Sequence, residues 1–266
     1  MTLADSAVAK KMFLLQYGQE PVPKWISVRG AGSEIMWEPI VSIAVETKDG
    51  WVLLEGGIGR RFLSDRENLT GIYRWGEEPW AVADDPLVTV LKGVGLEPGQ
   101  FVAAAISHLH VDHSGGIRTL AEAGVPVYIQ RAELEFGREG AKLTDGYYKP
   151  DYTGFPVEWR ELSGDAEIAT GVWALSTRGH TPGHMSYRVD LPHTGPWLFA
   201  ADAADLAENF TDRKPPGRCV LREDWPRAIM SIERLLEEKE RLGARLVPGH
   251  DQLFWDAVKH PPGGYA

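Results

Sequence analysis

The chain has 266 residues, and its composition of 43% hydrophobic and 25% charged residues is typical of a globular protein with a sizeable core, which excludes a disordered or collagen-like chain. The formal net charge of −10 argues against a broad basic surface for a nucleic-acid backbone. A single cysteine, Cys219, excludes an internal disulfide. No apolar run is long enough to cross a membrane or to form a signal-peptide core, which predicts a cytoplasmic protein without a membrane partner. From the charge we likewise expect no nucleic-acid partner.

Short runs rich in β-branched and aromatic residues, mostly bounded by Gly, Pro or Asp, predict strands along the whole chain. In chain order they cover residues 11–17, 39–47, 51–54, 101–107, 125–130, 171–177, 185–191, 197–201 and 244–247. The second and third runs are joined through Asp49 and Gly50, a dipeptide typical of a hairpin turn.

Segments between these runs carry apolar residues at helical spacing and predict helices. They cover residues 85–96, 115–123, 131–136 and 224–242. In the last of them Ile229, Ile232 and Leu235 fall on one face, and Gly243 stands where the helix is expected to end. Strands and helices mix without strict alternation, and no linker or repeat divides the chain. We therefore expect one layered α/β (α+β) sandwich domain over residues 1–266.

The strongest chemical signal is the hexapeptide His-Leu-His-Val-Asp-His at residues 108–113, directly after a predicted apolar strand. His108 and His110 lie two residues apart and therefore share one side of an extended segment. Asp112 and His113 follow at once, and imidazoles with a carboxylate suit zinc or a similar first-row ion. The alternative is a polar surface loop, but three of the eight histidines fall in these six residues. The pattern favours a metal site.

A single loop cannot surround a metal, so further ligands are expected from other strand ends, where the loops of an α/β scaffold gather. Three positions fit this expectation. His180 follows the strand predicted over 171–177, Asp202 follows the strand over 197–201, and His250 follows the strand over 244–247.

The hexapeptide, followed in order by His180, Asp202 and His250, resembles the metallo-β-lactamase superfamily over roughly residues 39–250. The resemblance implies a four-layer αββα sandwich with two divalent metal ions at one edge. It implies that His108, His110 and His180 hold one metal, that Asp112, His113 and His250 hold the second, and that Asp202 bridges them. By the same comparison His184, the second histidine of the segment 179–184, is structural.

Within the superfamily the ligand set and length resemble most the N-acyl homoserine lactone lactonases. Other branches fit less well. Cys219 is interpreted as a packed residue and not as the cysteine ligand of many β-lactamases, because Asp202 already ends the appropriate strand. The negative charge argues against the nucleases, and the flavodiiron members have Glu where this chain has His110.

Two positions depart from the lactonase pattern. Asp205 replaces the tyrosine that helps to hold the lactone carbonyl, and Glu55 stands where the superfamily usually has the Asp of Asp-Thr-Gly. We expect Glu55 to orient the metal loop through hydrogen bonds. An ionised Asp205 can only accept, so we expect it to accept from a substrate N–H or to orient a metal-bound water. The alternative is that Asp205 lies at the surface and caps the turn before Glu208.

The expected reaction is hydrolysis of a small-molecule lactone, above all an N-acyl homoserine lactone (quorum quenching), by a hydroxide held between the metals. Zinc is the expected metal, with iron, cobalt or manganese as alternatives. Asp112 and Asp205 are the candidate catalytic residues, and Asp112 is expected to pass a proton to the leaving group. A glyoxalase-II-like thioesterase, another ester hydrolase, or a binding module with an impaired site are the alternatives. A homodimer is compatible with the sequence, and no substrate-binding residue follows from it.

Overall fold

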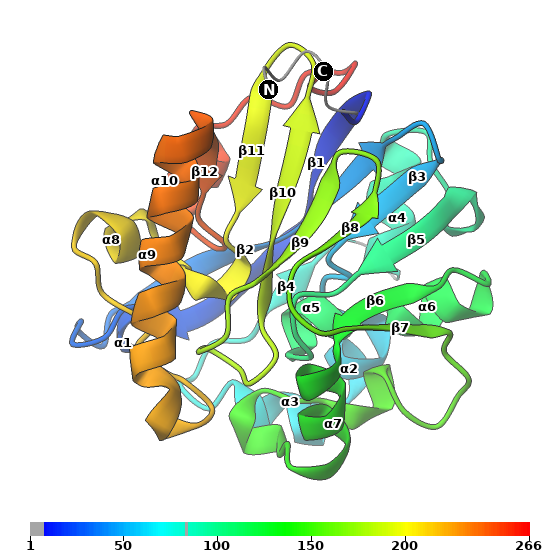
Figure 1. The fold of residues 1–266 in the computed structure, drawn as a ribbon. Helices are drawn as coiled ribbons and strands as arrows, with labels where there is room; N and C mark the ends of the chain where they lie inside the picture. The colour runs from blue at the N-terminus through cyan, green and yellow to red at the C-terminus, as the bar shows by residue number, and fades with distance from the viewer. Residues whose placement is uncertain (1–7, 83–84) are drawn as a thin grey trace.

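The computed structural model describes residues 8–82 and 85–266, and within them two β-sheets pack face to face (Figure 1). The first sheet has the strand order β4 (Trp80–Ala81), β1 (Lys11–Pro23), β2 (Ile35–Glu46), β3 (Trp51–Leu54), β5 (Phe101–Ala105), β6 (Val127–Gln130) and β7 (Trp159–Leu162). The second has the order β12 (Arg245–Val247), β11 (Gly195–Phe199), β10 (Met185–Leu191), β9 (Val172–Ser176) and β8 (Ala166–Ala169).

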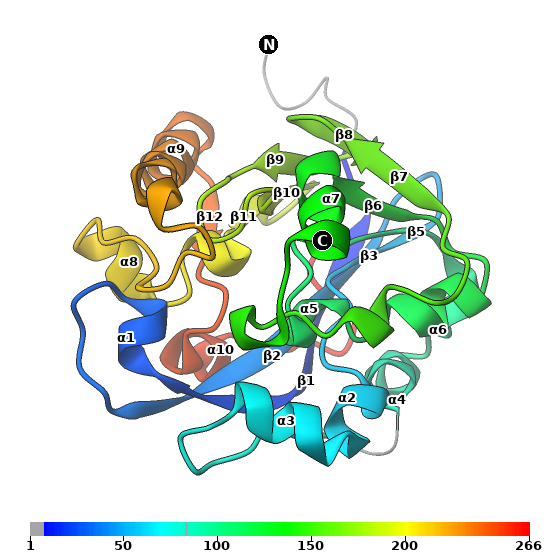
Figure 2. The ribbon, with the colours of Figure 1, turned by 90° about the horizontal axis from the view of Figure 1, so that it is seen from below.

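Helices cover the outer face of each sheet, and Figure 2 shows α9 on one side and α2, α3, α4 and α6 on the other. The helices are α1 (Lys24–Ser27), α2 (Arg60–Ser64), α3 (Arg66–Ile72), α4 (Pro86–Gly93), α5 (Val111–Ser114), α6 (Ile117–Glu122), α7 (Arg131–Glu139), α8 (Ala207–Thr211), α9 (Trp225–Leu242) and α10 (Gln252–Ala257). The predicted four-layer αββα architecture is therefore confirmed.

Apolar side chains hold the layers together. Between the sheets, residues such as Val52 and Ala105 pack with Phe199 and Val247 in one buried cluster. A second cluster joins the outer face of the first sheet to α2, α3, α4 and α6, and smaller clusters join α9 to β11 and β12. Alternate residues of each strand therefore face different layers, as the period of two in a strand requires.

The predicted elements are present, with differences at their ends. The hairpin between β2 and β3 turns through Gly50, whose φ is 130°, and Gly243 ends α9 with a φ of 61°. β1 is longer than predicted because it continues beyond Gly18 between β2 and β4. A Cβ at Gly18 would lie 1.9 Å from the carbonyl oxygen of Trp80, so only glycine lets β4 approach here. The strands β4, β7 and β8 were not predicted from the sequence pattern.

The strand directions place the loops that follow them at one edge. β9 and β11 both run antiparallel to β10, and β12 runs parallel to β11, so the carboxyl ends of these three strands open together. The loop after β5 and the short helix α5 lie at the same edge (Figure 1). Among the described helices, none combines the length and apolar character that a membrane span needs. The single-domain assignment over residues 1–266 stays a prediction.

Candidate metal centre and its pocket

All seven candidate metal ligands meet at this edge of the sandwich. The loop after β5 and helix α5 provide the four ligands of the hexapeptide, and the loops after β9, β11 and β12 provide one each. The ligand atoms form two groups, and within each group they lie within 4.8 Å of one another. The groups are His108, His110, His180 and Asp202, and Asp112, His113, Asp202 and His250.

Asp202 belongs to both groups, and its two oxygens face different partners. Its Oδ2 lies 3.5 Å from Nε2 of His108 and 3.3 Å from Nε2 of His180. Its Oδ1 lies 3.0 Å from Nε2 of both His113 and His250. Several ring nitrogens of the two groups are buried and have no hydrogen-bond partner within residues 8–82 and 85–266. Ring nitrogens that converge on one carboxylate in this way fit two divalent cations with a shared carboxylate ligand.

The remaining nitrogens of three rings are fixed by hydrogen bonds. Nδ1 of His108 lies 2.9 Å from Oγ of Ser107, and Nδ1 of His250 donates to the carbonyl oxygen of Pro39 at 2.9 Å. Nδ1 of His113 lies 2.8 Å from Oε2 of Glu55. These contacts aim the opposite nitrogen of each ring at the centre, as partners of metal-bound histidines usually do.

Glu55 makes the contact expected of it from the sequence. Its second oxygen accepts a hydrogen bond from the backbone N–H of Ser107 at 3.1 Å, so one carboxylate links two points of the ligand loop. Its φ of 74° is unusual for a residue with a side chain. The strained backbone carries the carboxylate to His113.

His184 is structural, as expected. Its Nδ1 donates to the carbonyl oxygen of Thr177 at 3.0 Å, and its Nε2 accepts from the backbone N–H of Asp202 at 3.0 Å. Burial lowers the pKa of His184 to about 3, so the ring is neutral and Nε2 carries the lone pair that accepts this hydrogen bond. His184 therefore positions Asp202 without joining either ligand group.

Glu133, a fully buried residue of α7, was not predicted from the sequence. One oxygen accepts from the backbone N–H of Leu109 and from the Tyr147 hydroxyl, at 3.1 and 2.8 Å. The other accepts from the Thr181 hydroxyl and the backbone N–H of Gly183, at 2.7 and 3.1 Å. Glu133 thus joins the loop that carries His108 and His110 to the loop that carries His180. Only the tertiary fold brings these donors together, and no local motif marks them.

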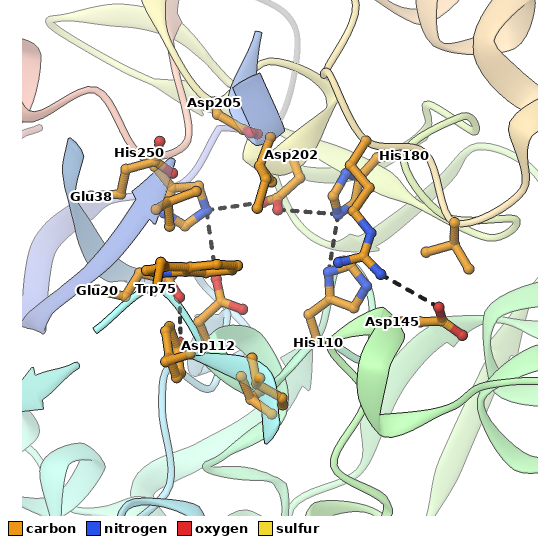
Figure 3. Close-up of a pocket in the computed structure, with 18 residues that line it drawn as sticks. Glu20, Glu38, Trp75, His110, Asp112, Asp145, His180, Asp202, Asp205 and His250 are labelled. Carbon is orange, nitrogen blue, oxygen red and sulfur yellow. Dashed lines mark hydrogen bonds and ion pairs between the residues drawn. The ribbon is translucent and has the colours of Figure 1, made fainter. Parts of the chain in front are cut away.

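An open pocket leads to the ligands (Figure 3). Apolar side chains from β1, α1, the end of α3 and the segment after α3 line part of it, and they include Val22, Ile26, Ile72 and Trp75. Of the five tryptophans in the first 80 residues, Trp75 alone belongs to this lining.

Asp205 also lines the pocket, so it does not cap a surface turn. It is 4% exposed, and its Oδ1 has no hydrogen-bond partner among the described residues. Burial and the neighbouring Asp202 carboxylate raise the pKa of Asp205 well above its usual range, and bound divalent cations act in the opposite direction. Cys219 is buried outside both ligand groups, and burial raises the pKa of its thiol to about 12, as expected of a packed residue.

Known proteins are similar to this chain in sequence and in fold. The family model of the metallo-beta-lactamase superfamily matches residues 35–250, a span that contains all seven candidate ligands. An N-acyl homoserine lactonase of a Bacillus species is 31% identical over 219 residues, covering 82% of this chain and 83% of the relative. One from Azorhizobium caulinodans is 29% identical over 248 residues, covering 89% of each chain. A solved N-acyl homoserine lactone hydrolase, with the product N-hexanoyl-L-homoserine at its catalytic metal centre, aligns with a TM-score of 0.84 and 27% identity over 97% of this chain and 100% of that one.

Proposed function

The chain belongs to the metallo-beta-lactamase superfamily, and from this membership we propose that it is a metal-dependent hydrolase that opens the ester bond of lactones, in particular N-acyl homoserine lactones. The observation that carries the proposal is Asp202, whose two oxygens face two ligand groups beside an open pocket. The relatives that share most of the chain's length are lactonases, which supports a lactone ester as the bond that is cleaved.

The two groups would each hold one ion. His108, His110 and His180 would bind the first, Asp112, His113 and His250 would bind the second, and Asp202 would be shared by both. Imidazole and carboxylate donors favour zinc, although iron, cobalt and manganese accept the same donors. When bound, the two ions lower the pKa of water so that it attacks near neutral pH, and they polarise the ester carbonyl.

Asp112 is the residue that moves the proton in this proposal. Its Oδ2 lies 2.8 Å from Nε2 of His113, within the second ligand group, and its side chain also lines the pocket. We assign its other oxygen, Oδ1, to take a proton from the attacking water and pass it to the alkoxide oxygen that leaves when the ester C–O bond breaks. The product is a single ring-opened molecule that carries both the carboxylic acid and the new hydroxyl group.

A comparison of substrates tests the reaction class. Metal-loaded protein is assayed in a pH-stat with N-acyl homoserine lactones, thioesters and β-lactams, and we expect the largest kcat/KM for the lactones. Hydrolysis of thioesters far faster than lactones would assign the protein to the glyoxalase-II-like thioesterases instead. If none of these substrates is hydrolysed, the alternative of a binding module with an impaired site would be favoured.

The role of Asp205 is tested by two substitutions. Asp205→Asn keeps an oxygen that can accept a hydrogen bond from a substrate N–H, and we expect this variant to keep substantial activity. Asp205→Ala removes the acceptor oxygen. We expect kcat/KM of this variant to fall by one to two orders of magnitude, roughly 1.4–2.7 kcal/mol of transition-state stabilisation. Metal content is measured in parallel. Equal kcat/KM for wild type and Asp205→Ala at equal metal content contradicts the role.

A further inference from the structure

Besides Asp145, three carboxylates that belong to neither ligand group line the same pocket. They are Glu20, Glu38 and Asp205, which are 8%, 3% and 4% exposed. Glu20 of β1 and Glu38 of β2 stand directly opposite each other in the antiparallel register, so both side chains leave the same face of the sheet. Figure 3 shows this pair on the side of the pocket opposite Asp145, with Asp205 beyond Asp202. We call these three residues the acidic wall.

No cationic side chain among the described residues pairs with the acidic wall. Glu20 accepts a hydrogen bond from the hydroxyl of Tyr73, and Glu38 accepts one from the hydroxyl of Ser27. Both donors are neutral, and Oδ1 of Asp205 has no partner at all among the described residues. The guanidinium that lines the pocket, Arg218, lies 3.5 Å from the carboxylate of Asp145. The wall therefore has acceptors without a matching positive charge.

Such an arrangement is unfavourable unless a ligand completes it. Like charges directly opposite on neighbouring strands destabilise a sheet, and a buried carboxylate needs a partner. Burial accordingly raises the pKa of Glu20 and Asp205 well above the usual range and that of Glu38 to about 7, so the three carboxyls resist ionisation unless a cation approaches them. Two divalent ions at the ligand groups would carry four positive charges, of which Asp112, Asp202 and the expected hydroxide would offset three. The three carboxylates of the wall outnumber the one that would remain. An apolar acyl chain placed against the wall would remove water from the carboxylates and return no hydrogen bond.

We propose that the acidic wall binds a positively charged nitrogen of the substrate, so that the enzyme prefers lactones carrying a protonated amine near the ester to lactones with a purely apolar acyl chain. This inference rests on the proposed lactonase function and names its substrate class. The described residues contain no third group of convergent ligands that includes Glu20, Glu38 or Asp205, which favours an organic cation over a bare metal ion. An ammonium group offers three N–H donors and forms charge-assisted hydrogen bonds with carboxylates.

A matched pair of substrates isolates the charge. N-(3-aminopropanoyl)-homoserine lactone and N-butanoyl-homoserine lactone have chains of equal length, one ending in an ammonium and the other in a methyl group. With metal-loaded protein we expect kcat/KM to be about tenfold or more higher for the ammonium substrate, a difference of about 1.4 kcal/mol. The ratio of the two values is the readout, because a general structural defect lowers both alike.

Variants connect the ratio to the wall. Glu20→Gln and Glu38→Gln keep an acceptor for Tyr73 and Ser27 but remove one charge each. We expect the ratio to fall in each variant and to approach one in the double variant. Glu139→Gln makes the same charge change at an exposed position of α7 and should leave the ratio as in wild type.

The outcomes separate this inference from the proposed function. Hydrolysis of both substrates at equal rates, or a preference for the butanoyl chain, overturns the acidic-wall inference and leaves the lactonase standing. If neither lactone is hydrolysed, the lactonase proposal fails, and calorimetry with the two ring-opened products then tests the wall by itself. Binding of the ammonium product about tenfold more tightly supports the wall, and equal binding overturns it.

Discussion

The substitution Asp202→Ala is expected to lower lactone kcat/KM by about a thousandfold or more, which corresponds to about 4 kcal/mol of transition-state stabilisation. Asp202 contributes an oxygen to each ligand group, at 3.0–3.5 Å from the nitrogens of His108, His113, His180 and His250. Alanine removes both oxygens at once, so both groups lose the carboxylate that they share. Metal content should fall together with activity.

Elemental analysis and kinetics on the same preparations measure this result. Wild type purified without chelator should contain about two metal equivalents per chain, because the ligand atoms form two groups. His110→Ala removes a ligand from one group only and should lower the metal content less than Asp202→Ala does. Asp256→Ala, an exposed Asp on α10, is the control for loss of a carboxylate. Full metal content and activity in Asp202→Ala would refute the bridging role.

Glu133→Ala is expected to destabilise the metal-free protein by about 3–5 kcal/mol and to weaken metal binding by about 10–100-fold. The substitution leaves two backbone N–H groups and the Thr181 hydroxyl of the ligand loops, together with the Tyr147 hydroxyl, without their acceptor. Gly183 lies against α7 so closely that a Cβ there would be 2.2 Å from the backbone nitrogen of Glu133, so the loop has little room to rearrange. Both ligand loops should loosen together.

Urea unfolding of the metal-free protein measures the stability change separately from metal binding, and a competition titration with a chelator measures the affinity. Glu135→Ala changes an exposed glutamate of the same helix and should alter neither quantity by more than about 0.5 kcal/mol. Unchanged metal affinity in a destabilised Glu133→Ala would mean that the residue supports the fold without positioning the ligands.

Local patterns predicted the central strands because those strands are apolar and bounded by turn residues. They missed β7 and β8, whose Arg160, Glu161 and Glu167 side chains are exposed. Such edge strands are fixed by pairing with β6 and β9 and not by a local hydrophobic pattern. β1 beyond Gly18 was missed for a similar reason, since Glu20, Pro21 and Pro23 interrupt the apolar run while pairing with β2 continues.

The seven candidate ligands could be found from the sequence because each follows a strand, and ligand chemistry restricts the residue types. The hydrogen-bonded partners differ in this respect. Glu55 could be predicted because it occupies a position of a family motif. Glu133 could not be predicted, because its four hydrogen-bond donors come together around it only in the tertiary fold. The acidic wall can be recognised only from the register of β1 and β2, because no local sequence pattern indicates that Glu20 and Glu38 are neighbours.

The origin of the ligands in both sheets also has a consequence for the newly made chain. Four ligands leave the ribosome together in residues 108–113, but the second group lacks its last member until residue 250 of 266 has been synthesised. Domains fold as units, so neither group reaches full affinity before the second sheet has docked on the first. High metal affinity therefore requires that both sheets have folded and docked. A truncated chain has an incomplete set of ligands. Because a bound ion stabilises only the folded state, the metals then hold together the two halves whose meeting created their site.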